Sequence, residues 1–500
     1  MRQDYYGYKS IFAFILIGTA VTGLSDSVRA ATPQTNIVHS TVNGMGPPSS
    51  MDGLQTVDTG QGWYACEEGV KACSLWNTVK VVNIDPYQDI KYQIGKLAVT
   101  FPKGRPTFSL NDELVISLGG MFQYDVGAFV GTNARDRGPS MDSIRSHLRR
   151  GRFIVSAKYK GFVVTVTPDL GTSGVQNDSL FEASLRYQGF RHTSIDIGLL
   201  QPRVTMEDSE GSNLMEFVER PMVVDLVRNI AAANARLSFG GSHWEKRYIV
   251  AAYVTGPRYG PFQNFQRNQV GGVFRLAGRP VITKDIDLHV GVSGSMAFHG
   301  DNRKYSMNTG QEAQIWLQRP YVKTSSIDGV DSIWSIGPQV AFRYKRVLFM
   351  SEYYSIHMHR SAVNGENAPN LNFPGWYVSA NYTLFGQPRI YEAQRGVFIT
   401  PIGPTLNPAA GYWGALEWSS RWSVMDLNSH KTRYSDSGKL LGVHGGQQTV
   451  WSTGFNWYPS SQVKVMLDYN HIQASSALKS DYNPRGRSSN LIISRLQYNF

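Results

Sequence analysis

Apolar and polar residues alternate along many short segments of the chain. In residues 118–129, Phe122 and Tyr124 fall on one side of the repeat, and Gln123 and Asp125 fall on the other. A period of two places successive side chains on opposite faces of a β-strand. Each such segment is therefore predicted to be a strand with one apolar and one polar face, and the predicted fold class is all-β.

Sixteen segments of this kind are predicted as strands. They cover residues 118–129, 150–160, 162–168, 182–189, 194–200, 232–240, 246–255, 270–278, 286–298, 333–345, 346–357, 374–385, 411–424, 448–458, 462–473 and 490–500. Short and long connections take turns between them, and the connection at 386–410 is long where a short one is expected. An even count with alternating connections predicts a transmembrane antiparallel β-barrel of about 16 strands.

The last predicted strand runs to the end of the chain. Leu496, Tyr498 and Phe500 share one face of it, and Gln497 and Asn499 share the other. A terminal strand is an exposed edge unless it is paired on both sides, and closure of a barrel removes that edge. The ending therefore favours a closed barrel.

The first 30 residues have the pattern of an export signal. Arg2 and Lys9 carry positive charge, residues 11–24 are uncharged and mostly apolar, and residues 28–30 form a small-x-small cleavage site. The apolar run is shorter than the roughly 20 residues that a membrane-spanning helix needs. We therefore expect residues 1–30 to be a cleaved signal peptide and the mature chain to reach the periplasm.

The predicted organisation has three parts. After the signal peptide, residues 31–104 form a periplasmic N-terminal extension and residues 105–500 form the barrel. The two cysteines of the chain, Cys66 and Cys73, lie in the extension. An oxidising periplasm favours a disulfide between them over a metal pair or two free thiols.

The composition agrees with such a barrel and limits the classes of partner that the protein can have. Aromatic residues make up 12% of the chain and the mean hydropathy is -0.28, as expected for a wall that is apolar on one face only. Without residues 1–30, 46 basic and 36 acidic residues remain. Such a surplus fits nucleic acid, an anionic membrane face or an anionic solute as partner. Export argues against nucleic acid, so what matters is whether the positive charge lies outside or inside the barrel.

The phase of the alternation predicts which charges face the lumen. In residues 149–160, Phe153, Val155 and Tyr159 share one face. That face must meet lipid, because a charged Arg or Lys at the bilayer midplane costs about 2 to 4 kcal/mol. The basic residues predicted to face inward are Arg150, Arg152, Lys158, Lys160, Arg186, Arg236, Arg275, Arg343, Lys345, Arg421, Lys464 and Arg495. The inward acids are fewer, namely Asp125, Glu182, Asp196, Glu417 and Asp468, so the lumen is expected to be net positive and to suit small anions.

The third long connection, residues 201–231, has a pattern of its own. Leu214, Phe217 and Val218 fall at helical spacing in it. A connection of this length either caps the barrel from outside or folds into the pore, and we favour the insertion. Its cations are then candidates for the pore lining, namely Arg203, Arg220 and Arg228. Its acids are the counter-charges, namely Glu207, Asp208, Glu210, Glu216 and Glu219.

Several segments resemble one protein family, in the same order along the chain. They are RRGRFIVSAKYKGFVVTVTPDLG (149–171), LFEASLRYQGF (180–190), IDIGLLQPRVTMEDSEGSNLMEFVERPM (195–222), GYWGALEWSSRWSVMDLN (411–428), GFNWYPSSQVKVMLDYNHIQ (454–473) and RLQYNF (495–500). This set is similar to the phosphate-selective porin O and P family of Gram-negative outer membranes. Arg150 and Arg152 match the RxR-like start of its second strand, and Glu219, Arg220 and Pro221 match its FxER-like loop motif.

The resemblance, which spans roughly residues 105–500, implies a 16-stranded, trimeric, anion-selective porin in outer-membrane lipid. Such porins pass phosphate or polyphosphate past a ladder of arginines, with lysines near the constriction, and no cofactor is implied. Phe500 is similar to the signal that the barrel assembly machinery recognises. Met121 departs from the family, whose members often have a basic residue there, so a porin without phosphate preference stays an alternative.

An enzyme and a receptor barrel are the alternatives to a porin. An enzyme needs a nucleophile or an activated water beside a histidine and an acid, and the sequence contains no GxSxG, HExxH or Walker motif. His357 and His359 lie at a strand end, where incidental surface histidines are expected rather than metal ligands. A receptor barrel with a plugged lumen predicts a compact plug in residues 31–104 and no conductance.

Overall fold

The computed structural model describes residues 54–58, 63–67, 91–94, 96–111, 113–131, 144–171, 180–233, 235–259, 269–298, 303–309, 312, 320–363, 365–475 and 487–500. The predicted signal peptide, Cys73 and most of residues 31–104 lie outside these described residues, so the predictions made for them stay predictions. Within the extension, β1 (Leu54–Asp58) and β2 (Trp63–Glu67) form a two-stranded sheet.

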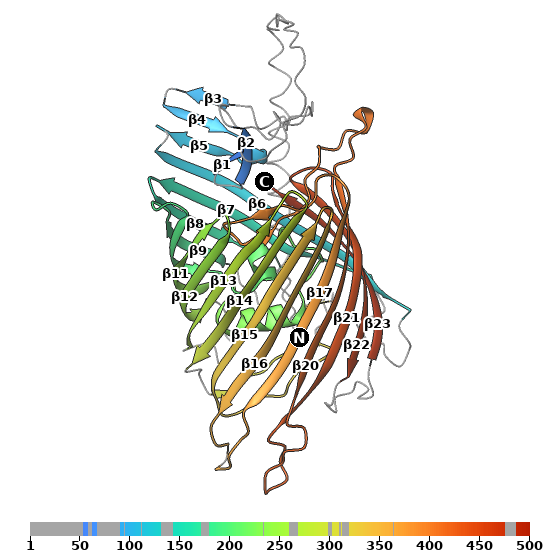
Figure 1. The fold of residues 1–500 in the computed structure, drawn as a ribbon. Coiled ribbons are helices and arrows are strands. Elements are labelled where there is room, and N and C mark those ends of the chain that lie inside the picture. Colours follow the sequence, from blue (N-terminus) through green and yellow to red (C-terminus); the bar gives the residue numbers. More distant parts are fainter. Residues whose placement is uncertain are drawn as a thin grey trace, which may run out of the picture. The chain divides into compact units, whose positions relative to one another are not determined.

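Sixteen antiparallel strands form a closed barrel (Figure 1). They are β6 (Leu114–Val130), β7 (Arg145–Tyr159), β8 (Phe162–Pro168), β9 (Leu180–Tyr187), β10 (Thr193–Leu200), β11 (Arg236–Glu245), β12 (Tyr248–Arg258), β13 (Val270–Ile282), β14 (Ile286–Phe298), β15 (Val330–Tyr344), β16 (Val347–Arg360), β17 (Leu371–Phe385), β20 (Ala415–Ser429), β21 (Val443–Tyr458), β22 (Val463–Ser475) and β23 (Arg487–Asn499). Each pairs with the next, and β23 pairs with β6 to close the ring. The predicted strand count and fold class are confirmed.

A small meander precedes the barrel in the same sheet. It consists of β3 (Lys91–Ile94), β4 (Leu97–Thr100), a short 3-10 helix η1 (Pro102–Gly104) and β5 (Thr107–Leu110). β5 pairs with the start of β6, from Leu114 to Ser117, whereas β23 pairs with β6 only from Met121 onward. The meander therefore uses the part of β6 that extends beyond the closed ring.

The wall has the predicted alternation of side chains. On β8, Phe162, Val164 and Val166 are exposed on the outer face, whereas Thr165 and Thr167 are buried. The same pattern continues round the ring, with polar residues buried on the inner side and apolar residues exposed on the outer side. A wall of this kind is stable where its outer face meets lipid and its inner face meets polar groups.

The last residue of the chain lies against the first strand of the barrel. The Gly120 N–H donates to the Phe500 carbonyl oxygen (3.0 Å), and the Phe500 N–H donates to the Gly120 carbonyl oxygen (3.1 Å). A Cβ atom added to Gly120 would lie 2.3 Å from Cε1 of the Phe500 ring. The ring of Phe500 therefore occupies the space that the absence of a side chain at Gly120 provides.

The connection at 386–410, which is long where the alternation predicts a short one, is a folded segment. It contains β18 (Tyr391–Glu392), β19 (Val397–Phe398) and a 3-10 helix, η4 (Pro408–Ala410). Val397 and Phe398 are fully buried and pack with Met206, Leu348 and Met350. Its length therefore reflects a segment packed against the inner wall and not a missed pair of barrel strands.

The long connection after β10 contains two helices, α2 (Met206–Glu210) and α3 (Met222–Ala231). The predicted helical position of Leu214, Phe217 and Val218 is wrong, because these residues lie between the two helices. Gly211, with a φ of +79°, ends α2, and Pro221 precedes α3. The Val218 N–H donates instead to the Asp468 carboxylate (2.7 Å), so wall contacts replace helical hydrogen bonds there.

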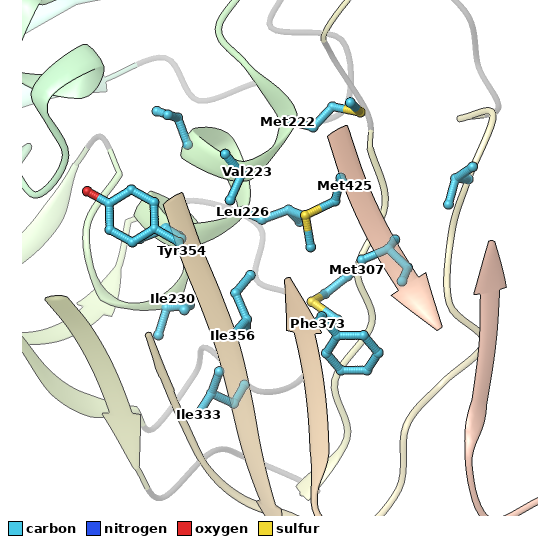
Figure 2. Close-up of a cluster of buried hydrophobic side chains, with 14 of the residues drawn as sticks. Met222, Val223, Leu226, Ile230, Met307, Ile333, Tyr354, Ile356, Phe373 and Met425 are labelled. Carbon is cyan, nitrogen blue, oxygen red and sulfur yellow. The ribbon is translucent and has the colours of Figure 1, made fainter. Parts of the chain in front are cut away.

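Helix α3 is held against the inner wall by an apolar cluster (Figure 2). Met222, Val223, Leu226 and Ile230 on the helix pack with side chains of the wall and of the β14–β15 connection, namely Met307, Ile333, Tyr354, Ile356, Phe373 and Met425. Complete burial of one such side chain stabilises by about 1.5 to 3 kcal/mol. One side of the interior, along β15, β16, β17 and β20, is therefore filled by apolar packing.

Among the described residues, no helix is long and apolar enough to span a membrane.

Replacing Gly120 by valine is expected to weaken closure of the barrel, because the new side chain overlaps the ring of Phe500. We expect a lower fraction of folded barrel, measured by electrophoresis of outer-membrane preparations with and without boiling. Gly278→Val is the matched control, since a Cβ there meets only the Arg247 carbonyl oxygen at 3.7 Å. Equal folded fractions for the two variants would contradict this role of Gly120.

Candidate functional site

Glu219 is the centre of a charged network inside the barrel. Its carboxylate accepts two hydrogen bonds from Arg149 (2.6 and 3.2 Å) and one from Arg495 (3.3 Å), and lies 4.0 Å from Arg150. Burial alone would raise the pKa of Glu219, but Arg149, Arg150 and Arg495 hold it well below its usual range. The network therefore attaches the connection between α2 and α3 to β7 and β23.

Acidic side chains hold the helix N-termini of the same segment. Glu352 on β16 accepts from the Met206 N–H (2.6 Å) and the Glu207 N–H (3.2 Å) at the start of α2. Glu312, in the β14–β15 connection, accepts from the Met222 N–H (2.9 Å) at the start of α3. The first N–H groups of a helix have no intrahelical partner and favour negative charge nearby. The inserted segment is therefore fixed through its backbone as well as its side chains.

Besides Arg495, which pairs with Asp125 (2.6 Å), four of the predicted lining residues are paired with carboxylates. Arg152 pairs with Asp169 (2.7 Å), Arg186 with Glu182 (2.7 Å), Arg228 with Asp208 (2.8 Å) and Arg421 with Glu312 (2.8 Å). Each pair joins two parts of the interior or braces one strand. Their charge toward a solute is therefore largely compensated.

Arg150 and Arg220 are more weakly compensated. Arg150 donates to the Gln123 side-chain oxygen (2.6 Å) and is 4.0 Å from Glu219. Arg220 is 3.7 Å from Asp208. Burial, followed by the neighbouring Arg228, lowers the pKa of Arg220 below its usual value, although a guanidinium keeps its proton at neutral pH.

Arg236 and Arg275 lie in the interior but bind the backbone. Arg236 donates to the carbonyl oxygens of Ala232 (2.7 Å) and Gly256 (3.2 Å). Arg275 donates to the carbonyl oxygens of Arg395 (2.6 Å) and Gly396 (2.7 Å), which lie between β18 and β19. Both arginines are almost completely buried. Through these hydrogen bonds they hold the backbone after α3 and the backbone between β18 and β19 against the barrel wall.

Lys158, Lys160 and Arg343 lie near the ends of strands. Lys158 is exposed close to the end of β7. Lys160 is in the β7–β8 turn, with a φ of +51°, and its Nζ lies 5.2 Å from the centre of the outward-facing Tyr159 ring. The predicted inward orientation of Lys160 is therefore wrong, because the turn interrupts the alternation. Arg343 donates to turn carbonyl oxygens at residues 284 and 345 (3.3 and 3.2 Å).

The turn between β15 and β16 contains a similar lysine. Lys345 also has a φ of +51°, and its Nζ lies 5.3 Å from the centre of the Tyr344 ring. Tyr344 is exposed on the outer face. The inward orientation predicted for Lys345 fails for the same reason.

Arg203 differs from all of these. It is partly buried just before α2, and within the described part of the chain it makes no hydrogen bond or ion pair. Burial, followed by the guanidiniums of Arg395 and Arg186, lowers the pKa of Arg203 to about 10. It therefore stays charged at neutral pH, and Glu392 favours this charge less than the two arginines oppose it.

The alternation pattern missed two important arginines. Regular alternation would place Arg149 on the same face as Phe153, but a bulge opposite Gln123 and Tyr124 turns it inward beside Arg150. Arg389 comes from the connection before β18 and donates two hydrogen bonds to Glu417 (2.7 and 2.8 Å). The adjacent pair of arginines at 149 and 150 was a signal for the bulge, because both need a polar environment.

The formal charges of the interior nearly cancel. Among the buried side chains of the described residues, twelve are basic and thirteen are acidic. The acids, however, do not all carry charge. Burial, followed by Glu207 and Glu216, raises the pKa of Glu210 well above its usual range, and burial raises that of Glu216 to about 7 against the effect of Arg389. Because arginine does not lose its proton, the effective charge is more positive than the formal count.

The part of the chain that the structure describes contains no group of His, Cys, Asp or Glu suited to hold a metal ion. Among curated protein sequences, none matches this chain significantly. Similar solved structures include OmpT of Vibrio cholerae in its trimer form (12% identity, 78% of this chain and 100% of that chain covered, TM-score 0.45). They also include the outer membrane channel DcaP of Acinetobacter baumannii (9%, 79% and 99%, 0.45) and an anion-selective porin from Comamonas acidovorans (9%, 78% and 100%, 0.45).

The comparison with protein families gives a clear assignment. Residues 116–500, most of the chain, match the family described as "Phosphate-selective porin O and P". The match begins at the start of β6 and includes all of the remaining barrel strands. The chain therefore belongs to this family and is an outer-membrane β-barrel porin of Gram-negative bacteria, a channel and not an enzyme.

Proposed function

We propose that the protein is an anion-selective channel for passive uptake of phosphate, polyphosphate or similar small anions. The observation that carries this proposal is Arg203, a partly buried cation without a partner among the described residues. A guanidinium presents several N–H donors in a plane, which suits the oxygens of a phosphate. The two neighbouring arginines that lower its pKa, Arg186 and Arg395, are themselves about one third exposed and lie within reach of solvent.

The route of the solute follows from what fills the interior. Apolar packing of α3 occupies the side along β15, β16, β17 and β20. The partly exposed cations lie on the other side, where Arg186 on β9 and Arg203 before α2 are found. We therefore propose that the connection after β10 forms the constriction and that anions pass between it and this polar side of the wall.

Phosphate preference within the anions rests on the family. Met121 is buried on β6 and accepts a weak hydrogen bond from the Ser212 hydroxyl (3.8 Å). A thioether offers no charge to an anion, unlike the basic residue common in the family at this place. This observation favours the second candidate, a porin for small anions without phosphate preference.

A trimer is proposed from the shape of the wall. β8, β9 and β10 have only 7, 8 and 8 residues, whereas β20 and β21 have 15 and 16. Eight residues in a tilted strand span about 20 Å along the membrane normal, less than the apolar band of about 25 Å. This arc therefore needs a further apolar surface beside it, which neighbouring copies of the chain supply.

The proposal that Phe500 engages the assembly machinery before closure of the barrel rests on the sequence alone.

The purified wild-type protein is expected to give an anion-selective reversal potential in a planar bilayer under a KCl gradient. Arg203→Gln is expected to lower the anion-to-cation permeability ratio about threefold, as loss of one charge near a narrow path would. Arg433→Gln, in the exposed β20–β21 connection, is the control and is expected to behave as wild type. Cation selectivity or lack of conductance in the wild type would refute the proposal.

Phosphate separates the two candidate solute ranges. Addition of phosphate to the chloride-conducting channel is expected to reduce the chloride current more strongly than an equal concentration of sulfate does. Equal effects of the two anions would leave the anion channel in place but remove its phosphate preference.

Glu219→Gln is expected to loosen the constriction, because Arg149 and Arg495 lose the anionic partner that fixes the inserted segment. Breaking a buried ion pair in this way typically costs about 3 to 5 kcal/mol. We expect a larger and noisier single-channel conductance and faster cleavage of the segment by trypsin. Glu366→Gln, in the β16–β17 connection, is the control, and indistinguishable behaviour of the two variants would contradict the role of Glu219.

Native mass spectrometry in mild detergent is expected to give three chains per particle. In that assembly a cysteine replacing Ile197 on β10 is expected to be shielded from a lipid-soluble maleimide, and one replacing Leu467 on β22 is expected to react. The native residues are equally exposed in the single chain, at 50% and 51%. Equal reaction at both positions would place the interface elsewhere.

A further inference from the structure

Four carboxyl groups share two cations where the connection after β10 meets the connection between β17 and β20. The acids are Glu207 and Glu210 on α2, Glu216 after it and Glu417 on β20, and the cations are Arg389 before β18 and Lys464 on β22. All six are buried, with Glu210 and Glu417 fully inaccessible. Within this group of six, two negative charges would therefore lack a counter-charge if every carboxyl were ionised, although Arg220 also acts on Glu207.

Glu210 is the member without any donor. Neither of its carboxyl oxygens has a hydrogen-bond partner among the described residues. The nearby Arg395 donates to the main-chain oxygen of Glu210 (3.1 Å) and not to its carboxyl group. An ionised carboxylate in such surroundings would cost several kcal/mol, so the group is expected to keep its proton.

Glu216 is the member that joins the two inserted segments. Its carboxyl group accepts a hydrogen bond from the Asn381 side chain (2.6 Å) and lies 3.7 Å from Arg389. Arg389, however, already donates two shorter hydrogen bonds to Glu417. The Arg389 guanidinium therefore compensates the charge of Glu216 only in part.

The other elements packed round this pair add no free cation. Lys464 donates to the Met215 carbonyl oxygen. Arg421 on β20 pairs with Glu312 (2.8 Å). The phenols of Tyr377 on β17 and Tyr458 on β21 also face the pair, and their hydroxyls donate to the titratable acids Glu352 (2.9 Å) and Glu417 (3.5 Å).

We propose that Glu210 and Glu216 form a proton-binding pair that determines the charge selectivity of the channel. With protons bound, the pair is neutral and the arginines of the interior are in excess. When Glu216 loses its proton, negative charge appears on the segment that forms the proposed constriction, and the preference for anions falls. This inference rests on the proposed anion selectivity and adds the residues and the ion, H⁺, that regulate it.

The direction of the pH dependence follows from the carboxyl group. Glu216 has its pKa raised to about 7, so it is mainly neutral below that pH and mainly ionised above it. Anion selectivity is therefore expected to be high at pH 5.5 and lower at pH 8.5. One charge on the segment that forms the proposed constriction is expected to change the permeability ratio by about 2- to 5-fold.

The test is the reversal potential of single channels under a KCl gradient at pH 5.5, 7.0 and 8.5. The wild type is expected to lose anion selectivity with a midpoint near pH 7. Glu216→Gln, which imitates the protonated acid, is expected to keep high anion selectivity at all three values. Glu210→Gln, which imitates an acid that keeps its proton, is expected to leave the pH step in place, and Glu113→Gln, exposed on the β5–β6 turn, is expected to match wild type.

Several outcomes would overturn the inference. An anion-selective wild type with no pH dependence refutes the proton-binding pair and leaves the proposed channel function intact. A pH step that persists in Glu216→Gln assigns the titration to other groups, such as the histidines, and also refutes it. Cation selectivity at every pH removes the proposed function and this inference together. The heat-modifiable folded fraction of each variant, measured in parallel, separates these outcomes from misfolding.

Discussion

The pairing of buried guanidiniums with buried carboxylates is the interaction on which the interior of this barrel depends. A ring of sixteen strands encloses more space than its own side chains fill, so chain from the connections must enter it. That chain meets an inner wall made of polar side chains, and a buried charge without a partner is costly. Glu219 meets this requirement by joining β7 and β23 to the segment after β10.

The same requirement explains how an interior that is nearly neutral in formal charge could suit the proposed anionic solutes. Arginine stays protonated under all physiological conditions, whereas a buried carboxyl group becomes neutral when its surroundings do not stabilise the charge. Acids that hold helix N-termini or arginines remain part of the structural network. Those such as Glu210, without donors, give up their charge, and Arg203 keeps its own. The proposed selectivity would thus arise from unequal responses to burial and not from a simple excess of basic residues.

Two inserted segments from different parts of the chain support one another. The segment with α2 and α3 enters after β10, and the segment with β18 and β19 enters between β17 and β20. Met206 packs with Phe398 between them, and Arg395 binds the backbone at Glu210. The two segments are therefore in direct contact, and Glu216, through its ion pair with Arg389, is one of the residues that join them.

The sequence by itself determined the sixteen strands, their outward and inward faces and the ring that they form. These features depend on the period of two along each strand and on the lengths of the connections, which are local properties. The tertiary structure decided what the inward charges do, because pairs such as Arg495 with Asp125 join residues that are far apart in the chain. It also decided the exceptions, since the bulge at Arg149 and the turn at Lys160 interrupt a pattern that assumes regular strands. Whether a buried arginine braces the wall or meets a solute depends on which carboxylate the fold brings beside it, and the period of the sequence does not contain that information.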